Sequence, residues 1–185
     1  PYHTVMLPFT RLQGGPMDYT PGIFETRLSD WSNNPSYVHT TLCGQLALYL
    51  VMYSPLQMAA ELPEHYEKYD DAFQFIRDVA CDWDDSKYLE AEPAEYITVA
   101  RKAKGTDNWF VAGKCNEDGH NRTVKFDFLD KGRKYETTIY ADAKNACFDK
   151  NPKAYVITKR KIKKGDVLKF TQAPGGGFAV SVKAL

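Results

Sequence analysis

Residues 123–140 read Thr-Val-Lys-Phe-Asp-Phe-Leu-Asp-Lys-Gly-Arg-Lys-Tyr-Glu-Thr-Thr-Ile-Tyr, and this stretch decides the fold class of the C-terminal half. It contains two runs of β-branched and aromatic residues, 123–129 and 135–140, which are typical of strands. Between them stands Asp130-Lys-Gly132, a turn signal, because glycine tolerates the positive φ that tight turns require. The stretch therefore predicts two antiparallel strands joined by a short turn.

The same pattern recurs on both sides of this stretch. Further strand-like segments lie at 96–100, 109–112, 155–158, 167–170 and 178–182, with Gly, Asn, Asp or Pro between them. Seven or eight short strands at a spacing of roughly ten residues are typical of an antiparallel β-sandwich. We therefore expect residues 84–185 to form a complete all-β sandwich domain. Its basic stretch 159–164 is expected on an exposed strand edge, where lysines discourage pairing with other chains.

Residues 1–80 show a different pattern. The apolar run His3–Thr10 predicts a short buried strand, with Pro8 near its end. Thr40 or Thr41 is expected to cap a helix over Leu42–Glu61 that is apolar nearly all round and is kinked at Pro55. A second, amphipathic helix is expected over Glu64–Asp78, with an aromatic stripe that packs in the core.

The N-terminal half lacks the neighbours that such elements need. A buried strand needs a partner strand, and a helix that is apolar on all sides needs cover on all sides. We therefore expect residues 1–80 to be an incomplete part of a larger α/β layer and the chain on its own to expose apolar surface on the long helix. The loop Arg11–Gly22 holds three Gly and two Pro but also Met17 and Tyr19, a composition that favours a fixed loop that packs or binds.

Charge is balanced overall but unevenly distributed. The chain has 24 basic and 24 acidic residues, which argues against nucleic acid or an anionic membrane as a partner. Residues 1–80 carry 4 basic and 9 acidic residues, and residues 81–185 carry 20 and 15, which indicates two parts of different composition.

The cysteines, histidines and apolar stretches give no targeting or metal motif. Four separate cysteines form no zinc-ligand spacing with the four histidines, so buried thiols are expected, and a Cys115–Cys147 disulfide stays open. No signal peptide is recognised. Residues 31–60 lack charged side chains, but polar residues and Pro55 interrupt the run, which favours a buried helix over a membrane span.

Several motifs resemble one known family. Leu7-Pro-Phe-Thr-Arg11, Gly15-Pro-Met-Asp-Tyr-Thr-Pro-Gly22, Gln45-Leu-Ala-Leu-Tyr49 and Tyr53-Ser-Pro-Leu-Gln-Met-Ala-Ala60 are similar to the end of the catalytic barrel of family 97 glycoside hydrolases. Trp83-Asp-Asp-Ser-Lys87, Tyr96-Ile-Thr-Val-Ala-Arg-Lys102 and Asp107-Asn-Trp-Phe-Val111 resemble the start of its C-terminal β-domain. The resemblance covers most of the chain and weakens after about residue 145.

The resemblance implies an architecture and an activity. Residues 1–80 would be the last strand, loop and helix of a (β/α)8 barrel, and the parent would also have an N-terminal β-sandwich. The parent would be a periplasmic or extracellular bacterial α-glycosidase, with an α-glucosidase acting on starch-derived oligosaccharides favoured and an α-galactosidase second. A calcium ion near the active site is implied, with ligands upstream of this chain. The expected partners are an oligosaccharide substrate, the missing domains and, as an open alternative, a second copy in a homodimer.

The resemblance also implies site residues. In such barrels the active site lies at the C-terminal ends of the strands. Arg11 and Asp18 are expected to hydrogen-bond sugar hydroxyls, and Phe9 or Tyr19 to pack on a sugar ring; the alternative is that they only fix the loop. Glycoside hydrolysis needs two carboxylates across the scissile bond, and no residue here matches the catalytic motifs. The pair Asp84-Asp85 is read as a solvated turn or a helix cap, and the chain alone is expected to be inactive.

Two non-catalytic interpretations stay open. The sandwich could be a carbohydrate-binding module, with Trp109, Phe110, Tyr135 and Tyr140 as a sugar platform, although core packing is the default for half of such residues. It could also be a structural module that stabilises the barrel or mediates dimer contacts.

Overall fold

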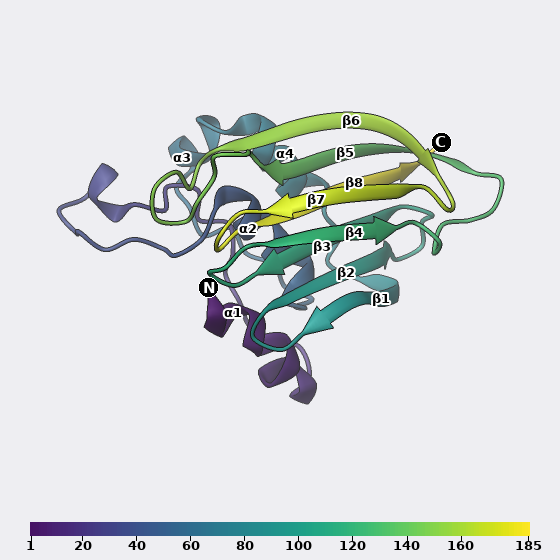
Figure 1. The fold of residues 1–185 in the computed structure, drawn as a ribbon, viewed down its shortest axis with the longest axis horizontal. Coiled ribbons are helices and arrows are strands. Elements are labelled where there is room, and N and C mark those ends of the chain that lie inside the picture. The colour runs from purple at the N-terminus through teal and green to yellow at the C-terminus, as the bar shows by residue number, and fades with distance from the viewer.

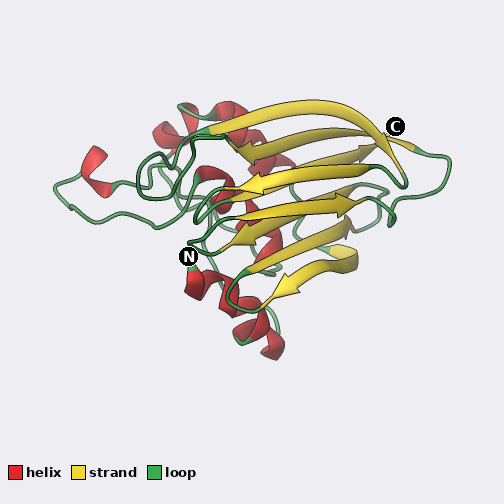
Figure 2. Cartoon of the chain, in the orientation of Figure 1, coloured by secondary structure: helices red, strands yellow, loops and turns green.

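The computed structural model describes residues 1–185 and has three layers: helices, a six-stranded sheet and a two-stranded sheet (Figures 1 and 2). The larger antiparallel sheet has the order β1-β2-β3-β8-β5-β6, and β4 pairs only with β7. The strands are β1 (Trp83–Glu92), β2 (Tyr96–Ala103), β3 (Trp109–Cys115), β4 (His120–Lys125), β5 (Lys134–Asp142), β6 (Tyr155–Lys163), β7 (Val167–Gln172) and β8 (Gly177–Ala184).

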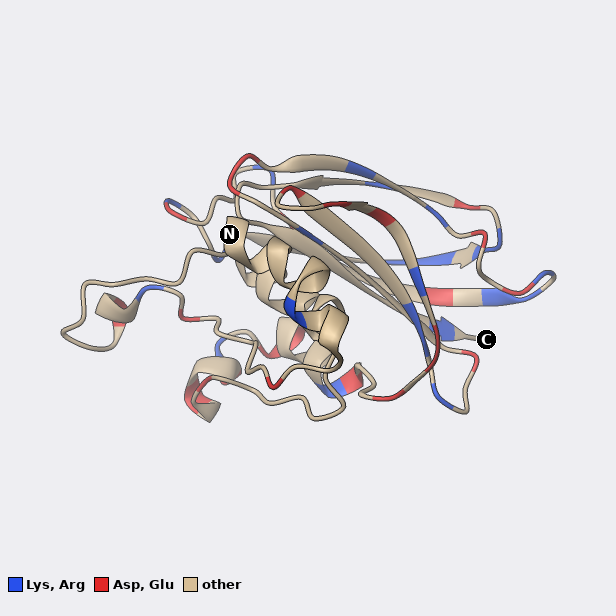
Figure 3. Ribbon diagram, turned by 90° about the horizontal axis from the view of Figure 1, so that it is seen from below, with Lys and Arg blue, Asp and Glu red and all other residues tan.

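Other elements pack on both faces of the larger sheet, and side-chain alternation divides its residues between the two faces. In β3, Phe110 and Ala112 pack in the core shared with the helices, whereas Trp109 and Val111 pack in the core shared with the two-stranded sheet. The seven predicted strands are confirmed, and the basic stretch lies on β6, an edge strand of the larger sheet. Lys and Arg are spread along these strands (Figure 3).

The eighth strand, β1, begins where the sequence indicated a turn. Asp84 and Asp85 are strand residues, so their interpretation as a solvated turn or helix cap is wrong. Asp84 accepts a hydrogen bond from the amide of Gly105 in the following β-turn region, and Asp85 pairs with Lys87. An edge strand with a solvated face accepts such acids, because their side chains point to water.

The long apolar helix is shorter than predicted. Helix α2 spans Leu42–Val51, and all ten of its residues are buried. Thr41 caps it by accepting a hydrogen bond from the amide of Gly44 at 3.0 Å, which confirms the cap. The helix ends at Val51, four residues before Pro55, whose ring would clash with the Val51 carbonyl if the helix continued. The Gln57 side chain then donates to carbonyls near the helix end, including that of Tyr49.

Two short helices replace the predicted second helix. Helix α3 (Pro63–Glu67) begins at Pro63, and α4 (Asp70–Asp78) follows after a break. Proline fits the first turn of a helix because its missing N–H would be unpaired there anyway. The aromatic stripe packs in or against the core as predicted, with Tyr66 buried and Tyr69 and Phe73 half-buried.

The predicted strand at His3–Thr10 is wrong. This segment forms helix α1 (Tyr2–Met6) and the 3-10 turn η1 (Leu7–Phe9), followed by η2 (Arg11–Gly14). Val5 and Pro8 are its buried residues, and a spacing of three brings them to one side of a helical turn, whereas a strand would separate them to opposite faces. Pro8 stands in the first turn of η1, where no amide donor is needed.

The apolar helix finds its cover within the chain. Leu42, Leu46 and Leu50 of α2 belong to one core with Phe110 of β3 and Tyr140 of β5. The expectation that the long helix exposes apolar surface is therefore wrong, because the six-stranded sheet covers it. None of the helices has the length and apolar character needed to cross a membrane.

Candidate functional site

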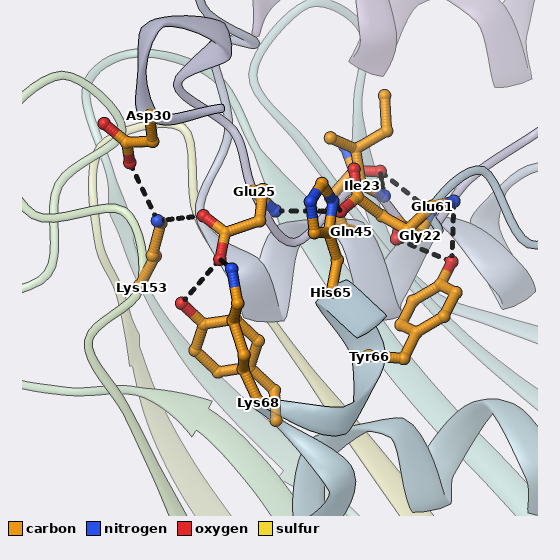
Figure 4. A network of polar contacts seen from close by, with 11 residues as sticks. Gly22, Ile23, Glu25, Asp30, Gln45, Glu61, His65, Tyr66, Lys68 and Lys153 are labelled. Atoms are coloured by element: carbon orange, nitrogen blue, oxygen red, sulfur yellow. Dashed lines mark hydrogen bonds and ion pairs between the residues drawn. The ribbon is translucent and has the colours of Figure 1, made fainter. Parts of the chain in front are cut away.

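The loop Gly15–Gly22 is held at its C-terminal end by side chains from two helices. Gly22 has a φ of +98°, which favours glycine, and a Cβ added there would lie 2.6 Å from the Tyr49 hydroxyl. The amides of Gly22 and Ile23 both donate to Oε1 of Gln45, at 2.9 and 3.1 Å (Figure 4). Gln45 is a buried polar residue on an otherwise apolar helix, so this loop supplies the partners that its side chain requires.

Two tyrosines complete the attachment. The Tyr49 hydroxyl lies 3.2 Å from the carbonyl oxygen of Pro21 and 3.0 Å from that of Met58. The Tyr66 hydroxyl donates to the carbonyl of Gly22 at 2.9 Å and accepts from the amide of Glu61 at 3.2 Å. Burial raises the pKa of both tyrosines, so both stay protonated and able to donate. Gly22 and Gln45, which are 23 residues apart in sequence, are therefore in contact at the end of this loop.

The four predicted substrate-contact residues lie on or near this loop but share no pocket. Asp18 is exposed and has no hydrogen-bond or ion-pair partner in the chain, and Tyr19 is half-buried with a pKa raised by burial. Arg11 reaches the carbonyls of Gly15 and Pro16, both at 3.5 Å, within its own loop. Phe9 packs against Val51 and its neighbours in a small core.

An apolar segment lies beside the loop. The amide of Ala60 donates to the carbonyl of Pro21 at 3.1 Å, and the Thr20 hydroxyl approaches the Met58 sulfur at 3.8 Å. Met58 and its neighbour Leu56 are 47% and 66% exposed. The loop and this segment therefore form one surface on which Asp18 and large apolar side chains both face solvent.

A buried carboxylate ties the chain after the loop to both halves of the molecule. Glu25 accepts hydrogen bonds from Lys68 at 3.2 Å, from the Tyr69 hydroxyl at 3.4 Å and from Lys153, which also pairs with Asp30 at 3.0 Å (Figure 4). Burial alone would raise the pKa of Glu25, but the bonds from Lys153 and Lys68 outweigh it and lower the pKa. Lys153 lies just before β6, so this network joins residues 25–30 to the β-domain.

A second carboxylate, Glu61, is engaged through its Oε2 atom. It lies 2.6 Å from Nδ1 of His65, one helical turn further on, and accepts from the amide of Glu25 at 3.4 Å. Glu25 and Oε2 of Glu61 thus fix backbone and neighbouring side chains. Two opposed carboxylates across an open site, which glycoside hydrolysis requires, are not assembled by these residues.

No group of three or more His, Cys, Asp or Glu side chains is arranged to hold a metal ion. All four cysteines are free thiols, so the open question of a Cys115–Cys147 disulfide is answered by two separate thiols.

The aromatic platform considered for the sandwich is absent. Trp109 and Tyr135 are buried between the two sheets, and Phe110 and Tyr140 are buried under the helices. The default interpretation, core packing, is therefore confirmed for these four residues, because other elements pack on both faces of the larger sheet.

A third polar cluster joins α2 to the sheets. Asp142 of β5 accepts from the Thr41 hydroxyl at 2.7 Å and from the amides of Ala173 and Gly177 at 3.0 and 2.8 Å. Burial raises its pKa to about 6. Lys114 of β3 is buried nearby and donates to the carbonyl of Gly175 at 2.6 Å. The sequence analysis did not predict the anchoring roles of three residues, Gln45, Glu25 and Asp142. The signal that could have found them is a polar residue inside an apolar segment, because such a residue requires a hydrogen-bond partner when it is buried.

Comparison with known proteins places these features in a wider group. The family profile described as "Glycosyl-hydrolase 97 C-terminal, oligomerisation" matches residues 82–183. The chain is 36% identical to the retaining alpha-galactosidase of Bacteroides thetaiotaomicron over 185 residues, which is 98% of this chain and 27% of that protein. A probable retaining alpha-galactosidase of Streptomyces bingchenggensis is 29% identical over 177 residues, 96% of this chain and 25% of that protein.

A solved structure agrees over the whole chain. A glycoside hydrolase family 97 enzyme from a Pseudoalteromonas species, solved in complexes with panose and with acarbose, superposes with a TM-score of 0.95 at 42% identity. The match covers 100% of this chain and 29% of that one. The chain thus spans less than a third of the length of each of these relatives.

Proposed function

This chain belongs to glycoside hydrolase family 97, whose C-terminal part it corresponds to, and from that premise we propose that it completes an enzyme that cleaves α-glycosidic bonds in oligosaccharides. The observation that carries the proposal is the attachment of Pro21 to Tyr49 and of Gly22 to Gln45 and Tyr66. A loop fixed so firmly at its base, with Asp18 free of partners at its exposed part, is suited to bind a ligand supplied from elsewhere.

The neighbouring apolar surface supports a role in completing a larger body. Leu56 and Met58 lie beside the loop and are largely exposed, and exposed apolar patches mark interaction sites. We propose that this surface packs on the catalytic barrel of the whole protein, so that the loop closes one side of the sugar pocket. Arg11 then holds the loop, Asp18 accepts from a sugar hydroxyl, and Tyr19 and Phe9 flank the ring.

For the substrate we propose α-glucosides first and α-galactosides second. The relative at 42% identity binds panose, a glucose oligosaccharide, and the curated relative at 36% identity is an alpha-galactosidase. The catalytic carboxylates and the calcium ligands are proposed to come from the part of the protein outside this chain. The periplasmic or extracellular location and the homodimer remain proposals on the same family basis.

The first experiment compares the whole protein with this chain. The whole protein is expected to release the aryl group from an aryl α-glucoside faster than from an aryl α-galactoside, and the 185-residue chain is expected to release neither. Hydrolysis by the chain alone would contradict the proposal, and so would a whole protein that cleaves neither substrate.

The second experiment tests the loop in the whole protein. Asp18→Ala is expected to lower kcat/KM about tenfold, equivalent to about 1.4 kcal/mol, because one hydrogen bond to the sugar is lost. Glu67→Gln is the matched control, since Glu67 is also exposed and has no polar partner but lies on α3 outside the loop. Equal activity of the two variants would remove Asp18 from the pocket.

A further inference from the structure

The face of the larger sheet opposite the helices is only partly covered. The two-stranded sheet of β4 and β7 lies over it, and β7 does not pair with β6 (Figure 1). Between β5, β6 and β7 a cleft of about 710 Å³ remains. This volume is in the range of small-molecule sites, which is roughly 300–1,000 Å³. Its apolar wall is formed by Ile139 and Ala141 of β5 and by Leu168 and Phe170 of β7.

One buried side chain at this cleft has no partner. Gln172, the last residue of β7, is 3% exposed, and neither Nε2 nor Oε1 makes a hydrogen bond. Strand β7 alternates between exposed and buried residues, so Gln172 lies on the same face as Leu168 and Phe170, toward the larger sheet. A buried amide whose donor and acceptor are both unpaired costs free energy. A ligand that both accepts and donates a hydrogen bond would satisfy the two groups.

The charge around the cleft is positive. Lys144, Arg160 and Lys169 line it, and none of their side chains makes an ion pair or hydrogen bond within the chain. Asp142 is the only acidic residue in the lining, and its oxygens are occupied by Thr41 and by two backbone amides. The cations are therefore free to meet an anion from solution.

We propose that this cleft binds an acidic saccharide, that is, a sugar that carries a carboxylate. Arg160 can bind the carboxylate through two parallel hydrogen bonds, with Lys144 adding charge. A ring hydroxyl both donates to and accepts from the Gln172 amide. The apolar C–H face of the ring packs on the wall around Ile139 and Phe170. The site lies across the sheet from the Gly15–Gly22 loop, so it is separate from the substrate pocket proposed above.

The test uses pairs of sugars that differ only in the carboxylate. Binding of D-galacturonate and D-glucuronate to the chain is measured by titration calorimetry beside D-galactose, D-glucose and acetate. At least one of the two acids is expected to bind at least about tenfold more tightly than its neutral partner and than acetate. No saturable binding of either acid, or equal binding of acetate, would overturn the proposal.

Two variants locate the site. Arg160→Ala is expected to weaken binding of the acid about tenfold or more, and Lys159→Ala is expected to leave it unchanged, because the neighbouring Lys159 lies on the opposite face of β6 and does not line the cleft. Gln172→Leu is expected to reduce binding while keeping the melting temperature, since it removes two unpaired buried atoms. Equal losses in Arg160→Ala and Lys159→Ala would show a general charge effect and overturn the assignment. Hydrolytic activity is not read out here, so this test and that of the proposed function fail independently.

Discussion

The two faces of the six-stranded sheet are covered in different ways. One face is filled by α2 and α4, whose buried side chains form a continuous core with Phe110 and Tyr140. The other face carries only two paired strands and keeps a cleft of about 710 Å³. The same strands contribute side chains alternately to both cores. The two faces therefore differ only in the elements that pack over them. Both faces contribute a buried core, but only the open face keeps a cleft lined by polar groups.

The largest expected effect is on the filled face. Phe75 of α4 is fully buried and makes edge-to-face contacts with Phe110 and Tyr140. Phe75→Ala is expected to lower the free energy of unfolding by about 3–5 kcal/mol, because the cavity is surrounded on all sides. The comparison variant is Leu168→Ala beside the cleft, expected to cost about 2 kcal/mol, near the lower end for such changes. Urea unfolding measures the free energy of unfolding of both variants. Equal losses of stability in the two variants would contradict the proposed difference between the two faces.

The second expected effect concerns Asp142, which joins the two faces. Its pKa rises from an ordinary value of 3.8 to about 6 in the folded protein, so the folded state binds this proton more tightly than the unfolded state. The stabilisation from this proton is fully present below pH 3.8 and is lost as the pH rises through about 6. The change corresponds to roughly 3 kcal/mol.

The test of Asp142 is a difference between two proteins. Asp142→Asn removes the titration while its amide can still accept from the backbone and donate to Thr41. The free energy of unfolding of the original minus that of the variant is therefore expected to fall between pH 4 and 6.5, by about the amount given above. A difference that does not vary with pH would contradict the assigned titration.

The third expected effect tests the base of the loop on the helical side. Gly22→Ala places a Cβ against the Tyr49 and Tyr66 hydroxyls and imposes a positive φ on alanine, which is expected to cost about 2 kcal/mol. Gly14→Ala is the matched control, because a Cβ there meets nothing within 4 Å and φ is not positive. Thermal unfolding distinguishes the two, and a neutral Gly22→Ala would mean that the loop adapts freely.

The smallest expected effect tests the link between the halves. Lys153→Met removes a partner of the buried Glu25 carboxylate and is expected to cost about 1–2 kcal/mol. Lys68→Met is expected to cost less than about 1 kcal/mol, because the Lys68 side chain is 54% exposed and its interaction is screened by water. Reversal of this order in chemical unfolding would make Lys68, which directly follows α3, the main partner of Glu25 instead of Lys153.

The secondary structure was best predicted in segments whose side chains follow a single periodicity. Strands such as Tyr96–Ala103 and Gly177–Ala184 were predicted because β-branched and aromatic residues lie between clear turn signals. Strand β1 was missed because Asp84, Asp85 and the glutamates that follow remove the apolar signal from an edge strand. The segment His3–Thr10 was misassigned because a short apolar run does not distinguish a strand from a helical turn.

The candidate site was only partly predictable, for a physical reason. The Gly15–Gly22 motif marked the loop, but sequence spacing does not show that Gln45 and Tyr66 would hold Gly22, since these contacts depend on tertiary packing. The need of residues 1–80 for cover was correctly recognised, yet its source was not. The β-domain that supplies the cover follows them in the same chain.

The shared core has a consequence for how such proteins can be recombined. The family profile begins at residue 82, but the sheet that it describes has one face filled by Leu42, Leu46 and Leu50. A chimera of two relatives joined at residue 82 would combine the helix of one with the sheet of the other. The side chains of α2 would then no longer be matched to the sheet side chains that they pack against. Exchange of the C-terminal module therefore has to begin upstream of Thr41, so that helix and sheet are inherited as one piece.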